Sequence, residues 1–370
     1  MCLNSPRVRL ILVSLFATAL YGYDVISDVL LAVAYSREAN HTMEFGLTTA
    51  YIVAPTILCN AICAYFIRVE TSAWTTEAFF QLILTFPFLL GPLVRHAKAI
   101  IRACRGKETQ KVEAHTALII LLEGYFESAS QLILQLYLSI VQDHHEELST
   151  RILRSAAMVG SGIGLAWSLV SVRRTNRLQD QDEDNDETLC GSIVYFLAKV
   201  CEVGPRVVLM ALFASHFTFY AFILGAGHWI ICSLWIFIID KTRERKSCIN
   251  IILKILIGYP LIFCFVDLDY VYTETEREHI PTRYKMMLYY LLFYTENWLM
   301  FALWITTMAD TVIWFYPVSI AIVAGGMVLH IIFQIIYYKG CHPGKENIPI
   351  LRKFTLDSCL YHDDEESKVV

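Results

Sequence analysis

The chain has 370 residues, of which 56% are hydrophobic and only 18% are charged, and its mean hydropathy is +0.49. These values exclude an ordinary soluble globular domain and indicate a polytopic membrane protein. The net charge of −5 argues against a nucleic-acid partner. The 11 cysteines follow neither a disulfide pattern nor a zinc-ligand spacing, so no disulfide framework and no bound metal are expected.

Ten apolar segments follow one another along the chain. The first follows Arg7 and Arg9 and is too long for the apolar region of a signal peptide, so we expect it to be a retained membrane span. The ten segments are 8–34, 45–67, 77–94, 114–141, 152–172, 192–214, 216–239, 248–266, 283–308 and 311–338.

A full membrane crossing by the third segment, 77–94, conflicts with the distribution of basic residues. Short basic loops favour the cytoplasm, so Arg7 and Arg9 place the N-terminus inside. A full crossing by 77–94 would then put six basic residues outside, namely Arg95, Lys98, Arg102, Arg105, Lys107 and Lys111. This segment is short and interrupted by proline and glycine, which predicts a half-helix that enters from the cytoplasm and returns.

The second half repeats this order. Segment 248–266 is again short, with Gly258 and Pro260 in its interior, and it lies between two predicted helical hairpins. We therefore expect an all-α polytopic membrane protein of about eight transmembrane helices plus two re-entrant half-helices, arranged in two repeats. The repeats are 1–172 and 192–338, joined by a charged cytoplasmic linker, 173–191, and followed by a cytoplasmic tail, 339–370.

A polar stripe lies within segment 114–141. Glu123, Glu127, Gln131 and Gln135 recur at i, i+4 spacing, which places them on one face of an α-helix. An ionised side chain at the centre of a bilayer costs roughly 3 kcal/mol on insertion scales. The stripe is therefore predicted to face a buried network or a watery furrow, and not lipid.

Charged residues also interrupt other predicted membrane segments. Buried charges usually pair, so the simplest arrangement brings the acids of 8–34 and 114–141 towards the bases Arg95, Lys199 and Arg206. The interrupting residues are Asp24 and Asp28 in 8–34, Arg95 at the end of the first half-helix, Lys199, Glu202 and Arg206 in 192–214, and Glu296 in 283–308.

Two interpretations of these charges remain open. They form either a static ion network that holds helices together or a polar lane for charged headgroups or ions. A proton relay is less favoured, because His228 and His330 are single histidines typical of hydrogen-bonded core residues. Signatures of enzymes are missing, including HExxH, GxSxG and the nucleotide-binding GxxxxGK[ST]. We therefore expect no catalytic residues, no cofactor and no active pumping.

One glycosylation sequon, Asn40-His41-Thr42, falls in the first loop that is predicted to be outside. Asn40 is therefore a candidate glycosylation site, although the loop is short and the sequon also fits a chance occurrence.

The stretch 123–138 reads EGYFESASQLILQLYL. It resembles the fourth segment of the XK-related family of membrane proteins, most closely from Gln131 to Tyr137, and its glutamates fall where the family has two. It departs at Ala129-Ser130, where the family usually has a proline. Three further stretches are similar to the family: YGYDVISDVLLAVAY at 21–35, YTENWLMFALW at 294–304, and the His-Pro after the last span, within 337–343.

The resemblance covers about residues 8–345 and implies a phospholipid scramblase-like protein of the plasma membrane, with both termini cytoplasmic. Such proteins expose phosphatidylserine on apoptotic cells. In several members a caspase cuts the C-terminal tail, and some work with a single-span membrane partner or a lipid-transfer protein. The chain lacks a DxxD motif, and its candidate cleavage sites are Asp357, Asp364 and Asp186. A non-catalytic partner subunit and a small-solute transporter are the alternatives.

Overall fold

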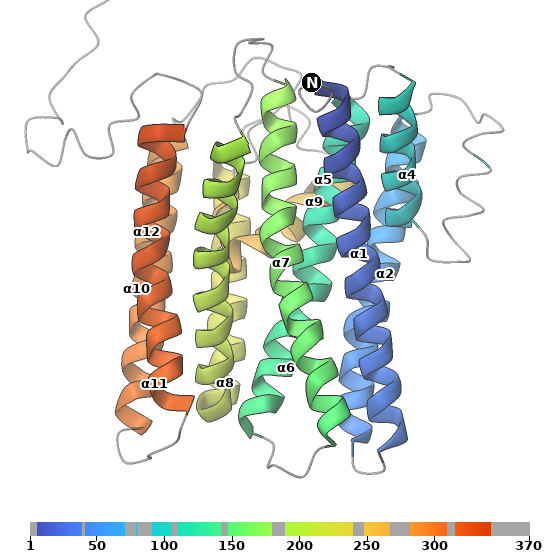
Figure 1. Cartoon of the computed structure of the whole chain (residues 1–370). Coiled ribbons are helices and arrows are strands. Elements are labelled where there is room, and N and C mark those ends of the chain that lie inside the picture. The colour runs from blue at the N-terminus through green and yellow to red at the C-terminus, as the bar shows by residue number, and fades with distance from the viewer. Residues whose placement is uncertain are drawn as a thin grey trace, which may run out of the picture.

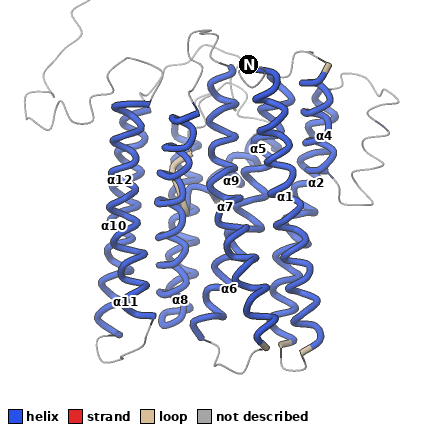
Figure 2. Tube along the Cα trace, in the orientation of Figure 1, coloured by secondary structure: helices blue, strands red, loops and turns tan. Residues whose placement is uncertain are grey.

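The computed structural model describes residues 6–38, 41–70, 79, 91–105, 110–141, 147–179, 189–239, 248–266, 282–308 and 315–341. The described part of the chain is helical, and it contains no strand (Figure 2). The principal helices are α1 (Pro6–Arg37), α2 (Thr42–Glu70), α4 (Gly91–Cys104), α5 (Gln110–Glu123), α6 (Ser130–Val141), α7 (Leu148–Gln179), α8 (Leu189–Ile239), α9 (Cys248–Gly258), α10 (Thr282–Met308), α11 (Phe315–Ile320) and α12 (Gly326–Ile336).

Four short elements interrupt or extend these helices. Three are π-helical, η2 (Gly124–Ala129), η4 (Ala321–Gly325) and η5 (Tyr337–Cys341), and one is the 3₁₀ turn η3 (Pro260–Ile262). η2 joins α5 to α6, while η4 joins α11 to α12. The long helices therefore continue across η2 and η4, whereas η5 follows α12 as the last described element.

The long helices stand side by side in one bundle (Figure 1). Within the described residues, six helical stretches are long and apolar enough to cross a membrane: 14–37, 42–68, 115–141, 148–173, 190–238 and 316–341. The prediction of an all-α polytopic membrane protein is confirmed. α1 begins and η5 ends at the same end of the bundle (Figure 1).

α8 is a hairpin of two helices. Phe217 has non-helical backbone angles, φ −121° and ψ 49°. Arg206 and His228 lie on either side of this point, and both reach the same oxygen, Oε2 of Glu296, at 2.7 Å. In a straight helix these two residues would lie about 33 Å apart. α8 therefore matches the predicted segments 192–214 and 216–239.

α10 has 27 residues, which makes a helix of about 40 Å, but it is not among the six stretches. The count of eight spans and the division into two repeats stay predictions.

The predicted half-helix 248–266 is a short helix followed by irregular chain. α9 has 11 residues, about 16 Å of helix, which is roughly half the hydrocarbon thickness of a bilayer. It ends at Gly258, and the α9 helix lies part-way along the bundle (Figure 1). Residues 259–266, which we call the break peptide, contain the 3₁₀ turn η3 and then leave helical geometry. Five hydrophobic side chains of the break peptide are buried: Leu261, Ile262, Phe263, Cys264 and Val266.

The predicted half-helix 77–94 lies outside the described residues, apart from 79 and 91–94. α4 begins at Gly91, where Pro92 fits because an N–H is dispensable in the first helical turn. The Gly91 N–H donates to Oδ1 of Asn60 on α2, at 2.8 Å. Arg95 thus lies in the second turn of α4, so the expectation that it ends a half-helix is wrong.

One helix crossing depends on a glycine. A Cβ on Gly326 would overlap the ring of Pro205, whereas a Cβ on the adjacent Gly325 would meet open space. We expect Gly326→Ala to lower the free energy of unfolding by about 1–3 kcal/mol, because the crossing of α12 and α8 must separate. Gly325→Ala is the matched control and should leave stability unchanged or slightly raised. The measurement is unfolding by SDS in mixed micelles, and equal effects of the two variants would contradict the prediction.

Candidate functional site: a buried polar row and a buried ion network

The stripe on α5, η2 and α6 is covered by protein. Glu123, Glu127, Gln131 and Gln135 are each no more than 5% exposed. α2 and α7 pack against α5, η2 and α6, and α1 reaches η2 and α6 through the side chains of Asp24 and Tyr35. The prediction that the stripe does not face lipid is confirmed.

The helix that carries the stripe is not α-helical throughout. The turn from Gly124 to Ala129 is π-helical and contains Glu127, so the expectation of one continuous α-helical face is wrong. The turn ends at Ala129-Ser130, the position where the chain departs from the proline of the family it resembles. π-helical turns inside α-helices are frequent at functional sites.

Four carboxylates gather around this π-turn, namely Asp24, Asp28, Glu123 and Glu127, which we call the acid cluster. Asp24 has partners for both oxygens: Ser161 donates to Oδ1 at 2.6 Å, and Ser128 donates to Oδ2 at 2.5 Å. Tyr21 lies within hydrogen-bonding reach of Glu123. The acid cluster therefore joins α1, α5, η2 and α7.

The other members of the acid cluster have oxygens without partners. Both carboxylate oxygens of Glu127, Oδ2 of Asp28 and Oε1 of Glu123 are buried and have no hydrogen-bond partner among the described residues. Burying a polar group without a hydrogen bond costs several kcal/mol in an apolar medium. Such atoms in a folded protein call for an explanation, such as a functional role or bound water. Among the described residues, no group of three or more His, Cys, Asp or Glu has a geometry that could hold a metal ion.

The polar row continues from the acid cluster along α6. Gln131 donates to the carbonyl of Thr48 at 2.8 Å, and Gln135 accepts a hydrogen bond from the Tyr35 hydroxyl at 2.7 Å. Tyr35 in turn accepts from Nε of Arg154 at 2.8 Å. We use "polar row" for the acid cluster together with these five residues. Sequence reasoning missed Arg154, although a single arginine inside segment 152–172 is a usable signal.

Lys199 and Arg206 do not neutralise the acid cluster. Lys199 lies 2.7 Å from Glu202, and Arg206 lies 2.7 Å from Glu296. The expected pairing of these bases with the acids of 8–34 and 114–141 is therefore wrong. The physical reason is that the break peptide needs hydrogen bonds at this depth of the bundle.

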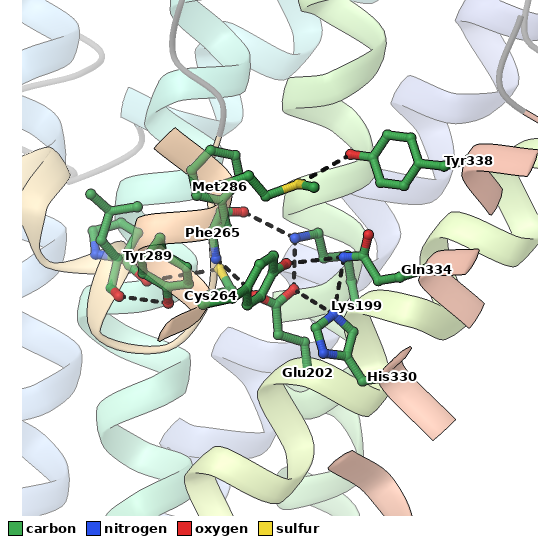
Figure 3. A network of polar contacts seen from close by, with 12 residues as sticks. Lys199, Glu202, Cys264, Phe265, Met286, Tyr289, His330, Gln334 and Tyr338 are labelled. Atoms are coloured by element: carbon green, nitrogen blue, oxygen red, sulfur yellow. Dashed lines mark hydrogen bonds and ion pairs between the residues drawn. The ribbon is translucent and has the colours of Figure 1, made fainter. Parts of the chain in front are cut away.

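The break peptide obtains those hydrogen bonds from charged side chains (Figure 3). Lys199 donates to the carbonyl of Phe265 at 3.0 Å, and Oε1 of Glu202 accepts from the N–H of the same residue at 2.9 Å. Arg206 donates to the carbonyl of Ile262 at 3.1 Å. Non-helical backbone at membrane depth is tolerated only where protein or water satisfies it.

Further residues complete what we call the ion network, formed by Lys199, Glu202, Arg206, Glu296 and their partners. His228 lies 2.7 Å from Glu296 and 3.1 Å from the carbonyl of Leu261. His330 lies 2.7 Å from the Tyr294 hydroxyl, and its ring also approaches Glu202 at 3.6 Å. Both histidines are thus hydrogen-bonded core residues, as predicted.

Arg95 is fully buried, with its guanidinium 5.9 Å from the centre of the Phe66 ring. The Phe66 ring also stacks on the His115 ring, with 4.1 Å between ring centres. Arg95 therefore lies in a packed group of α2, α4 and α5.

A model of the XK-related protein family matches residues 12–343. The chain belongs to the XK-related family. The matched region of this XK-related protein contains the whole acid cluster and the whole ion network. The candidate glycosylation site Asn40 and the candidate cleavage sites Asp186, Asp357 and Asp364 lie outside the described residues.

Proposed function

We propose that this XK-related protein moves phospholipids passively between the leaflets of the plasma membrane and so exposes phosphatidylserine. The observation that carries the proposal is the set of buried carboxylate oxygens without partners in the acid cluster. A stably folded bundle has no structural use for unpartnered carboxyl groups at membrane depth, whereas a lane for charged headgroups uses them as polar contacts.

The extent of the polar row supports this function. From Glu123 to Gln135 the row follows about 18 Å of helix, and Tyr35 and Arg154 extend it further. The hydrocarbon core of a bilayer is about 30 Å thick. Polar groups along this path would replace the hydration that a headgroup loses in hydrocarbon, while the acyl chains stay in lipid.

The described form is closed, because α1, α2 and α7 cover the polar row. Lipid movement along it requires these helices to separate, so the proposal includes an activating event. The family resemblance suggests a caspase cut in the tail at Asp357 or Asp364, or in the linker at Asp186, during apoptosis. A single-span membrane partner is a second route to activation.

The closed row also favours one rival function. If the row never opens, the charges serve only to hold helices together, and the chain is a non-catalytic subunit of another membrane or lipid-transfer protein. A small-solute transporter is the remaining alternative.

A liposome experiment tests the proposal. The purified full-length chain and a form truncated after Asp357 are placed in vesicles that contain fluorescent phosphatidylserine, and a membrane-impermeant quencher reports how much lipid reaches the outer leaflet. We expect the truncated form to expose the inner-leaflet lipid. Vesicles without protein control for spontaneous lipid movement. Release of a water-soluble dye trapped inside the vesicles measures leakage. If neither form moves lipid, with or without a co-reconstituted single-span partner, the proposal is wrong.

A further inference from the structure

The break peptide packs directly against the π-turn η2. The Tyr259 hydroxyl lies 2.8 Å from Oγ of Ser130, and the Tyr259 ring stacks on Phe126 with 4.3 Å between ring centres. The Tyr125 hydroxyl lies 3.1 Å from Sγ of Cys264. Five side chains thus form two polar contacts and one ring stack between the break peptide and the π-turn with its C-terminal flanking residue, Ser130.

On its other side, the π-turn faces the acid cluster. Ser128 donates to Asp24 on α1, and Glu127 belongs to the acid cluster. Tyr125 is completely buried and lies against Phe263 of the break peptide, with 5.6 Å between ring centres. η2 therefore lies between the acid cluster and the break peptide.

The break peptide is in turn held by the ion network. Lys199 and Glu202 bind the carbonyl and the N–H of Phe265, the residue next to Cys264 (Figure 3). A continuous chain of contacts thus runs from the ion network through Phe265, Cys264 and Tyr125 to the π-turn. It connects the buried charges of the second half of the chain with those of the first.

We propose that Tyr259 and Cys264 are positioning residues that hold η2 in its π-helical form and thereby keep the polar row closed. A π-turn contains one residue more than the α-helical turn it replaces, so its conversion to α-helix turns the following residues by about 100°. That rotation would move Gln131 away from Thr48 and Gln135 away from Tyr35. The consequence for lipid movement rests on the function proposed above, whereas the coupling itself does not.

Hydrogen exchange of the full-length chain in lipid nanodiscs tests the coupling without reference to transport. Cys264→Ala removes a polar contact to η2, and Tyr259→Phe removes one to Ser130, the residue that directly follows η2. We expect amides of residues 124–131 to exchange about three- to tenfold faster in each variant, the range for loss of one hydrogen bond. Cys264→Ser should restore slow exchange, because its hydroxyl can again bond Tyr125. Cys232→Ala is the matched control, since Cys232 is equally buried in the same core.

The same variants in the liposome assay should move lipid faster than the unaltered full-length chain. Unchanged exchange at 124–131 in both Tyr259→Phe and Cys264→Ala would overturn the coupling. So would an equal rise in Cys232→Ala, because the core would then have loosened generally. If exchange at 124–131 rises in Tyr259→Phe and Cys264→Ala but not in Cys232→Ala, and no form moves lipid, the coupling stands and the proposed function fails.

Discussion

Replacing Glu202 with leucine is expected to lower the free energy of unfolding by about 3–5 kcal/mol, because it leaves the buried Lys199 without its counter-ion. The variant also removes the acceptor for the N–H of Phe265, so the break peptide loses a hydrogen bond at membrane depth. Unfolding by SDS in mixed micelles measures the loss. This substitution affects three groups at once: the ammonium of Lys199, the N–H of Phe265 and the ring of His330.

A double variant provides the control. Lys199→Met together with Glu202→Leu removes both charges, and replacing a buried pair by apolar side chains is often nearly neutral. We expect the double variant to regain part of the lost stability, but not all, because the N–H and carbonyl of Phe265 stay without their partners. A loss below 1 kcal/mol for Glu202→Leu alone would show that water or another group satisfies Lys199, and would contradict the role assigned to the network.

Glu127→Leu should have the opposite effect on stability. Both oxygens of Glu127 are buried without a partner, so removing the carboxylate is expected to leave the free energy of unfolding unchanged or to raise it by about 1–3 kcal/mol. The same variant should reduce lipid movement by the activated form at least about tenfold, because the lane loses a central polar group. A gain in stability with a loss of activity is typical of a functional site.

Gln135→Leu is the matched control within the polar row. Gln135 is as buried as Glu127, but its side chain bonds to both Tyr35 and Thr48. We expect Gln135→Leu to destabilise by about 1–3 kcal/mol, since the Tyr35 hydroxyl loses its acceptor. If Glu127→Leu instead destabilises as much as Gln135→Leu, then Glu127 has a structural partner and the acid cluster belongs to a static network.

The sequence predicted the features that depend on a single helix and on whether its residues can face lipid or water. Glu123 and Gln135 had to be buried, because their spacing places them on one face of a segment too apolar to lie in water. Gly258 and Pro260 predicted the break after α9, since both residues weaken a helix wherever it packs. The all-α membrane fold followed from composition and segment length alone.

Only the tertiary structure decided the features that depend on two or more helices. Lys199 and Arg206 pair with Glu202 and Glu296 because the break peptide presents unsatisfied backbone groups beside them, and nothing in segment 192–214 reveals that neighbour. The π-turn at Glu127 is likewise invisible in the sequence, because π-helical turns are rare and the i, i+4 spacing of the stripe predicts an ordinary α-helix. The contacts of Tyr259 and Asp24 on its two sides arise only when the bundle assembles. Local patterns set what must be buried, and packing sets which buried group meets which.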